Sequence, residues 1–169
     1  MKDVYKGAYG NPDSRTHSYG DNARKIVETA REYVALLASL KKEEVFFTSG
    51  ATEGNNIVIQ GLVQYGIENN KKHIIVSAIE HKAVIQAAKS LEPFGFEVDV
   101  VEPKINGYVD VTEVISHVKE NTLLVSIMHV NNETGIIQPV KEIGEQLEKK
   151  GVLFHIDATQ SFGKLVDEI

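Results

Sequence analysis

Residues 152–160 read Val152-Leu153-Phe154-His155-Ile156-Asp157-Ala158-Thr159-Gln160, an apolar run that ends in a carboxylate. The run predicts a short buried strand with Asp157 at its carboxyl end. In an open α/β sheet, ligands bind at the carboxyl ends of the strands. A buried carboxylate is costly unless a cation or a hydrogen-bond donor meets it, and one ligand that fits is a protonated pyridine ring.

Apolar runs of strand length alternate with segments of helical periodicity along the rest of the chain. Short β-rich runs predict strands at about residues 44–48, 73–77, 96–100, 123–128 and 152–157. Apolar residues at helical spacing predict helices at about residues 22–40, 52–65, 82–91, 112–118 and 140–149, with Asp21 capping the first and Gly151 ending the last. The first twenty residues are rich in turn formers and predict a loop. This alternation is typical of an α/β fold with a mostly parallel sheet and helices on both faces.

Composition narrows the classes of function. The 169 residues, 42% hydrophobic and 25% charged, are those of one soluble globular domain with its own core. A net charge of −6 without a dense Lys/Arg run argues against nucleic acid or a membrane as partner. The sequence has no cysteine, so it offers no disulfide, thiolate metal site or cysteine nucleophile. No run is long enough to span a bilayer and no apolar signal segment opens the chain, so we expect a cytoplasmic protein.

A small-residue turn follows the first predicted strand, in Thr48-Ser49-Gly50-Ala51-Thr52-Glu53-Gly54. It leads into a predicted helix, whose free backbone N–H groups and positive dipole end favour an anion. Ser49 and Thr52 add hydroxyl donors, so the segment has the features of a phosphate cradle. Taken alone, the motif favours ordinary capping of the helix by Thr52 or Ser49 over a phosphate site.

Two further strand ends carry polar residues. His81 closes Ser-Ala-Ile-Glu-His at residues 77–81, where an imidazole could stack on a planar ring or transfer a proton. A lone histidine at this place is, however, more often a solvent-facing residue at a helix start. Asn131 and Asn132 follow the strand predicted at 123–128 and offer donors and acceptors to a ligand. A turn explains the pair equally well, and one of the two could serve each role.

Asp157 and Gln160 complete the set of polar residues at strand ends. Their spacing supplies an acceptor for a ring nitrogen and, three residues on, an amide for a neighbouring oxygen. The alternative for Asp157 is the N-cap of a helix. No metal-site spacing stands out, and we treat His129, Glu133, His155 and Asp157 as a chance cluster. The sequence also lacks a nucleophile elbow, a Walker lysine and a dinucleotide-binding glycine motif.

Together these segments resemble the cysteine desulfurases, class V aminotransferases with the fold type I architecture that binds pyridoxal phosphate (PLP). The resemblance covers essentially the whole chain, and five motifs in the family's order and spacing make it specific. They are residues 10–20 (Gly-Asn-Pro-Asp-Ser-Arg-Thr-His-Ser-Tyr-Gly), 47–53 (Phe-Thr-Ser-Gly-Ala-Thr-Glu), 77–81 (Ser-Ala-Ile-Glu-His), 126–135 (Ser-Ile-Met-His-Val-Asn-Asn-Glu-Thr-Gly) and 155–160 (His-Ile-Asp-Ala-Thr-Gln).

The resemblance implies a role for each residue of the predicted site. His81 would be catalytic, since it would stack on the pyridine ring of PLP and assist proton transfer. Asp157 would keep the ring nitrogen protonated, so that the ring acts as an electron sink. The remaining implied contacts are with the cofactor phosphate (Ala51 and Thr52) and with the phenolic oxygen (Asn132 and Gln160).

The resemblance also implies a reaction and shows where this sequence departs from the family. The family takes sulfur from L-cysteine and leaves L-alanine and a cysteine persulfide, which supplies iron–sulfur clusters and tRNA thiolation. Its Schiff-base lysine belongs to a segment beyond Ile169, and Lys164 falls too early to take that role. We therefore expect residues 1–169 to form one partial PLP-transferase large domain without the small C-terminal domain. We expect no covalent attachment of PLP at the family position and no turnover by this chain alone.

Three hypotheses on partners remain open at this point. The chain could be a subunit of a split desulfurase, completed by a second chain and then acting on a small amino acid. It could instead be a non-catalytic fragment or descendant of the fold that acts through dimerisation, since the family works as homodimers. The third hypothesis is an unrelated nucleotide-binding α/β domain that uses the turn at residues 49–52.

Overall fold

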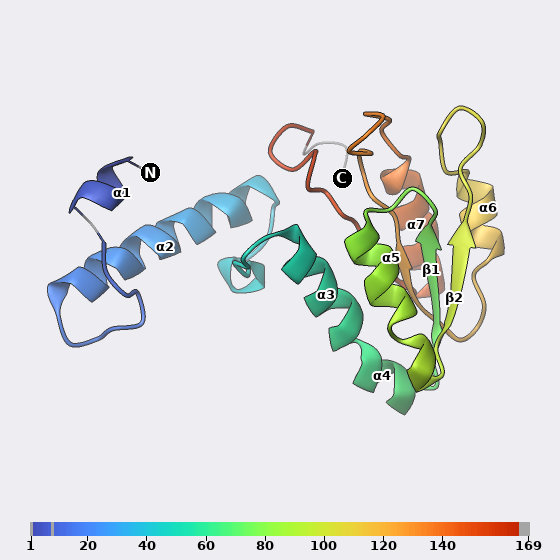
Figure 1. The fold of residues 1–169 in the computed structure, drawn as a ribbon, viewed down its shortest axis with the longest axis horizontal. Coiled ribbons are helices and arrows are strands. Elements are labelled where there is room, and N and C mark those ends of the chain that lie inside the picture. The colour runs from blue at the N-terminus through green and yellow to red at the C-terminus, as the bar shows by residue number, and fades with distance from the viewer. Residues whose placement is uncertain (1, 8, 166–169) are drawn as a thin grey trace. The chain divides into compact units, whose positions relative to one another are not determined.

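The computed structural model describes residues 2–7 and 9–165, which fall into two compact parts, Met1–Phe47 and Thr48–Ile169 (Figure 1). The first part contains helices α1 (Lys2–Gly7) and α2 (Ser18–Leu37) and the 3₁₀ helix η1 (Lys42–Glu44). The second part contains the sheet and the other helices. Across the described residues, every helix is too short or too polar to cross a membrane.

The start of α2 differs from the prediction. The helix begins at Ser18, and its N-cap is His17, whose Nδ1 accepts the Gly20 N–H at 3.1 Å. The prediction that Asp21 caps this helix was therefore wrong. Asp21 lies within the first turn, where its carboxylate interacts favourably with the positive end of the helix dipole. The prediction of a loop over the first twenty residues was also wrong for α1 and for the first residues of α2.

The strand predicted at residues 44–48 does not form. Glu44 ends η1, and the following four residues have no regular secondary structure. Phe46 and Phe47 are 81% and 51% exposed. A strand requires a neighbouring strand for its backbone hydrogen bonds, and the described sheet offers none to this segment.

The second part is built on a parallel sheet. Its four strands are β1 (His73–Ser77), β2 (Glu97–Val101), β3 (Thr122–Ser126) and β4 (Leu153–His155), in the order β2-β1-β3-β4. All three pairings are parallel, with Ile74 opposite Val98 and Leu124, and Leu124 opposite Leu153. The predicted parallel α/β sheet is thus confirmed, and β1 has the predicted bounds.

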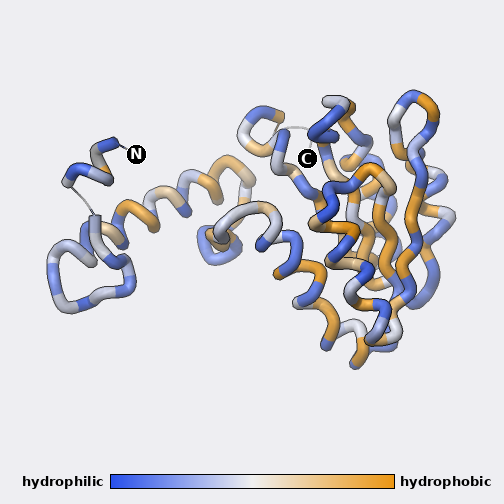
Figure 2. The backbone as a smooth tube through the Cα atoms, viewed as in Figure 1, coloured by the Kyte–Doolittle hydropathy of each residue, from blue (hydrophilic) through white to orange (hydrophobic). Residues whose placement is uncertain are grey.

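Helices cover both faces of the sheet, as the sequence predicts (Figure 1). Alternation along β1 sends Ile74 and Val76 into one core with α3 (Ala51–Gly61) and α5 (Lys82–Lys89). Ile75 enters the other core, with α6 (Val111–Ser116) and α7 (Val140–Lys150). The strands form the hydrophobic centre between these layers, and the loops beyond their ends are largely hydrophilic (Figure 2).

The helix predicted at residues 52–65 is divided in two. The helix α3 ends at Gly61, and α4 (Val63–Glu68) begins after Leu62. In α4, Gly66 lies so close to Phe96 and Leu123 that even a methyl group would require its neighbours to shift. At the other end of the chain, Gly151 ends α7 in the left-handed conformation, with φ of 64°, as predicted. A 3₁₀ helix, η2 (Glu92–Phe94), precedes β2.

Candidate functional site

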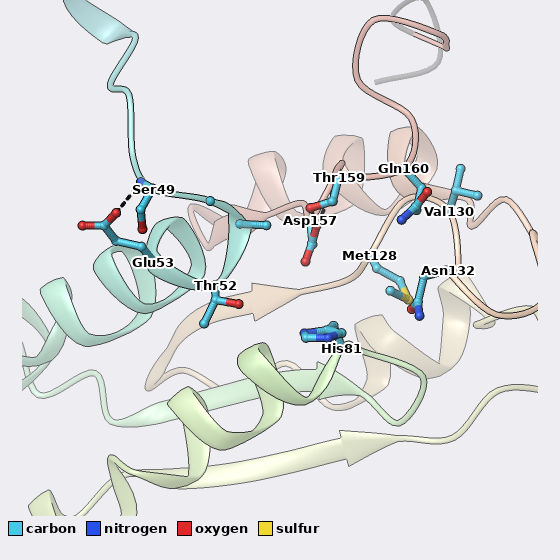
Figure 3. Close-up of a pocket in the computed structure, with 12 residues that line it drawn as sticks. Ser49, Thr52, Glu53, His81, Met128, Val130, Asn132, Asp157, Thr159 and Gln160 are labelled. Atoms are coloured by element: carbon cyan, nitrogen blue, oxygen red, sulfur yellow. Dashed lines mark hydrogen bonds between the residues drawn. The ribbon is translucent and has the colours of Figure 1, made fainter.

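A cavity of about 460 Å³ lies beyond the carboxyl ends of β1, β3 and β4 (Figure 3). This position agrees with the general location of ligand sites in open α/β sheets, and the volume suits a small molecule. All six residues predicted for the site lie on its wall. The lining residues are Ser49, Gly50, Ala51, Thr52, Glu53, His81, Met128, Val130, Asn132, Asp157, Thr159 and Gln160.

One wall of the cavity is the amino-terminal end of α3. Gly50 is the N-cap and has no side-chain cap hydrogen bond, so neither Ser49 nor Thr52 caps this helix. The first amides of a helix have no partner within the helix, and here they begin at the cavity wall. Glu53 accepts the Ser49 N–H at 2.5 Å, which lowers the pKa of its carboxyl group. Its carboxylate lies on the side of α3 away from His81 (Figure 3), so the amides near Thr52 remain suited to an anion.

His81 is fixed by its place at the start of α5. It is the N-cap, and its Nδ1 accepts the Ala83 N–H at 3.2 Å. This hydrogen bond leaves Nε2 for other partners and fixes the ring from one side. The ring faces the space below Asp157, between Thr52 and Asn132 (Figure 3). The histidine therefore caps a helix and lines the cavity at once.

Asp157 is held as an anion by hydrogen-bond donors. It is 8% exposed, and Asn55 Nδ2 donates to Oδ2 at 2.8 Å. The Thr159 N–H and hydroxyl donate to Oδ1 at 3.0 and 2.5 Å. Burial raises the pKa of the Asp157 carboxyl, but these hydrogen bonds and nearby His155 outweigh burial and lower it. The residues that follow form turns, so Asp157 does not cap a helix as the alternative proposed.

The adjacent asparagines have separate roles. Asn131 is a turn residue, because its Oδ1 accepts the N–H groups of Glu133 and Thr134 at 3.0 and 2.9 Å. Its Nδ2 donates to the Ile79 carbonyl at 3.1 Å, which links this turn to the loop before α5. Asn132 lines the cavity. The sequence left both roles open for the pair, and the structure assigns the turn to Asn131.

Asn55 is a polar residue of the site that the sequence analysis missed. It is only 5% exposed, and it anchors Asp157 from α3, 102 residues earlier in the chain. A weak signal exists in the sequence: Thr52, Asn55 and Ile59 recur at helical spacing, and Ile59 is fully buried. A buried amide on that face needs a partner, and Asp157 is that partner.

Lys164 and the cluster of His73, Glu97 and Asp99 lie outside the cavity. Lys164 is exposed and contacts the Gln160 carbonyl at 3.3 Å rather than lining the cavity. His73, Glu97 and Asp99 come within metal-binding distance of one another at the opposite edge of the sheet. The Lys119 ammonium contacts both carboxylates there, at 2.7 and 3.1 Å, so we assign an ion-pair network to that cluster.

The family model of aminotransferase class-V proteins matches residues 1–167. The chain belongs to this family. Cysteine desulfurase IscS of Pectobacterium carotovorum is 46% identical over 159 residues, which are 94% of this chain and 39% of the relative. IscS of Vibrio cholerae is 45% identical over 163 residues, which are 96% of this chain and 40% of the relative.

Solved structures of similar proteins share the fold. DndA from Streptomyces lividans has a TM-score of 0.89 and 47% identity, over 99% of this chain and 46% of DndA. SspA in complex with cysteine has a TM-score of 0.88 and 38% identity, over 97% of this chain and 47% of SspA. This chain therefore spans about 40% of the length of the curated relatives and less than half of these two solved chains.

Proposed function

We propose that this chain forms the PLP-binding part of a cysteine desulfurase. One observation carries the proposal: an uncapped helix start, a histidine ring, a buried anionic aspartate and two amides line the same cavity. These groups come from segments far apart in the sequence. A generic phosphate site would need only the helix start, whereas a phosphorylated pyridine uses all of them.

The residues of the cavity fit PLP by their chemistry. The amides of Ala51 and Thr52, with the Thr52 hydroxyl, would hold the phosphate at the positive end of α3. Asp157 would accept a hydrogen bond from the protonated ring nitrogen, which its lowered pKa favours. Asn132 and Gln160 both lie on the side of the cavity away from Thr52 (Figure 3), and their amides would donate to the phenolic oxygen.

Two residues of this chain would take part in the chemistry. When bound, PLP supplies an electron sink for carbanion chemistry. Asp157 would keep a proton on the ring nitrogen, because three donors already stabilise its negative charge. His81 would stack on the ring and use Nε2 to move a proton, since its Nδ1 is occupied by the Ala83 N–H.

Substrate and assembly belong to the whole protein and are part of the proposal. The names of the relatives and the cysteine complex of SspA support L-cysteine as the substrate. The family resemblance implies that the sulfur would be delivered to iron–sulfur clusters or thiolation. We propose a homodimer or a completing second chain as the assembly. Exposed apolar side chains on α3 and α4, such as Ile57 at 56% and Tyr65 at 49%, support association. Sedimentation velocity tests this, and a monomer at every concentration would argue against a homodimer.

Binding of a PLP analogue tests the proposed cavity directly. We choose 4′-deoxypyridoxine 5′-phosphate, because it has no aldehyde and cannot react with surface lysines. Calorimetry should show saturable binding of one analogue per chain. Thr52→Ala combined with Asn132→Ala should weaken it by about tenfold or more, because hydrogen bonds to a charged ligand are lost.

The matched control is Thr112→Ala, since Thr112 is an exposed residue in the first turn of α6. It should leave the affinity unchanged. Two results would overturn the proposal: no saturable binding by the unaltered chain, or equal affinity for pyridoxine without its phosphate.

A further inference from the structure

Glu80 is a buried carboxyl group next to the cavity, and the proposed function gives it no role. It directly precedes His81 and is 6% exposed. Its Oε1 accepts the Ser77 hydroxyl at 2.5 Å and the Met128 N–H at 2.6 Å. Buried carboxyl groups are rare unless they are paired, so this one requires an explanation.

The two donors to Glu80 belong to neighbouring strand ends. Ser77 is the last residue of β1, and Met128 lies two residues beyond β3 on the cavity wall. These strands are adjacent in the sheet. One carboxyl oxygen therefore joins the turn that carries His81 to the segment that leads to Asn132. The hydrogen bond from Asn131 Nδ2 to the Ile79 carbonyl, at 3.1 Å, is a second link between the same two segments.

The second oxygen of Glu80 has a different environment. Oε2 is buried without a hydrogen-bond partner among the described residues. Burial, and to a smaller extent the negative charge of Asp157, raise the pKa of Glu80 to about 7 against the lowering effect of the hydrogen bonds from Ser77 and Met128. The titratable residues that directly follow Glu80 in the chain are His81 and Lys82. Two nearby carboxyl groups thus differ: Asp157 favours the anion, whereas Glu80 favours the neutral acid.

We propose that Glu80 is a positioning residue that fixes the His81 ring against the cavity by bonding the end of β1 to the Met128 backbone. It acts through His81 and the β3 end and does not touch the ligand. Its neutral form adds no second negative charge next to Asp157. The consequence for PLP rests on the proposed function, whereas the placement of His81 does not.

Backbone amide NMR of the whole chain tests this placement without any ligand. The Met128 amide reports the bond to Glu80, and the Ala83 amide reports the bond to His81 Nδ1. Spectra are recorded from about pH 5 to 9, which spans the ionisation of Glu80. In the unaltered chain, the Met128 amide shift should show an inflection near pH 7.

Three variants separate positioning from simple folding effects. Glu80→Gln keeps an acceptor oxygen but does not titrate. The chemical shifts of the Met128 and Ala83 amides should therefore keep their low-pH values, and the pH inflection of Met128 should vanish. Glu80→Ala removes the link, so the Ala83 amide should exchange with solvent about tenfold faster or more. Ser77→Ala removes one donor to the carboxylate and should move the inflection to higher pH, and it remains informative if Glu80→Ala does not fold. The control is Glu145→Gln on the exposed side of α7, which should change nothing.

The same variants are titrated with 4′-deoxypyridoxine 5′-phosphate. Glu80→Gln should bind within about threefold of the unaltered chain, and Glu80→Ala about tenfold more weakly. An unchanged Ala83 amide in Glu80→Ala, or a Met128 inflection that survives in Glu80→Gln, would refute the inference. If the unaltered chain fails to bind the analogue while the amides respond as expected, the proposed function fails and the role of Glu80 stands.

Discussion

At the scale of single residues, the negative charge of Asp157 is stabilised by the hydrogen-bond donors around it. Its three donors come from Asn55 on α3 and from Thr159, and together they leave the cavity side of the carboxylate for a ligand. An anion stabilised in this way can attract a cationic ring nitrogen without losing its charge. The charge of Asp157, rather than its shape, should therefore determine its effect on binding.

Asp157→Asn tests the importance of that charge. The amide preserves the size of the side chain but cannot stabilise a protonated ring. We expect the affinity for 4′-deoxypyridoxine 5′-phosphate to fall by about tenfold to a hundredfold at pH 8, the loss typical of a charge-assisted hydrogen bond. The absorption spectrum of the bound analogue should also shift towards the unprotonated ring. Asp110→Asn, at the half-buried N-cap of α6 and outside the cavity, is the matched control. Equal affinity and spectrum for both variants would count against the ring contact.

The residues that sequence alone could predict are those at strand ends. Thr52, His81, Asn132, Asp157 and Gln160 each follow or precede a periodic segment, so their meeting at one edge of the sheet follows from a parallel α/β fold. Their long-range supports could not be found in this way. The bond from Asn55 to Asp157 spans 102 residues, and the bond from Met128 to Glu80 spans 48. Local patterns carry no information on such pairs.

At the scale of elements, the buried strands were the most predictable. The run His73–Ser77 is buried at every position, and its apolar centre, Ile74 to Val76, is flanked by one buried polar residue at each end. The segment at residues 44–48 has the same β-rich composition but lacks a partner strand in the described sheet. Composition reports the preference for an extended backbone, whereas a strand also requires hydrogen bonds from a neighbour.

Gly66 in α4 gives an element-scale prediction on packing. A Cβ at this position would lie 2.6 Å from the Lys71 carbonyl oxygen, 2.8 Å from Phe96 Cζ and 3.0 Å from Leu123 Cδ2. Gly66→Ala should therefore lower the free energy of unfolding by about 1–3 kcal/mol, despite the better helix propensity of alanine. Gly61→Ala is the control, because a Cβ at that position would have no neighbouring atom within 4 Å. Urea unfolding measures both, and a Gly66→Ala variant as stable as Gly61→Ala would show that α4 can move to accept the methyl group.

At the scale of the whole molecule, buried ionisable groups determine how stability depends on pH. Burial lowers the pKa of His73 and His155, so the unfolded chain binds more protons and stability falls as the pH drops through about 6.5. Asp157 has a lowered pKa, so its contribution is present above about pH 4 and is lost in stronger acid. Glu80 acts in the opposite direction to both, because the folded state holds its proton up to about pH 7.

A comparison of the unaltered chain with Glu80→Gln isolates this last effect, since both share the histidines and Asp157. The folded chain binds more protons at Glu80 than the unfolded chain between pH 4.5 and about 7, so the contribution of Glu80 to stability declines as the pH rises through that window. Glutamine does not titrate. Relative to the unaltered chain, Glu80→Gln should therefore gain roughly 2–3 kcal/mol in free energy of unfolding between about pH 4 and pH 8. Urea unfolding at both pH values, with Glu145→Gln as control, measures this change. If the difference in free energy of unfolding between the two chains stays constant with pH, Glu80 is ionised in the folded state. The assignment of a neutral Glu80 would then be wrong.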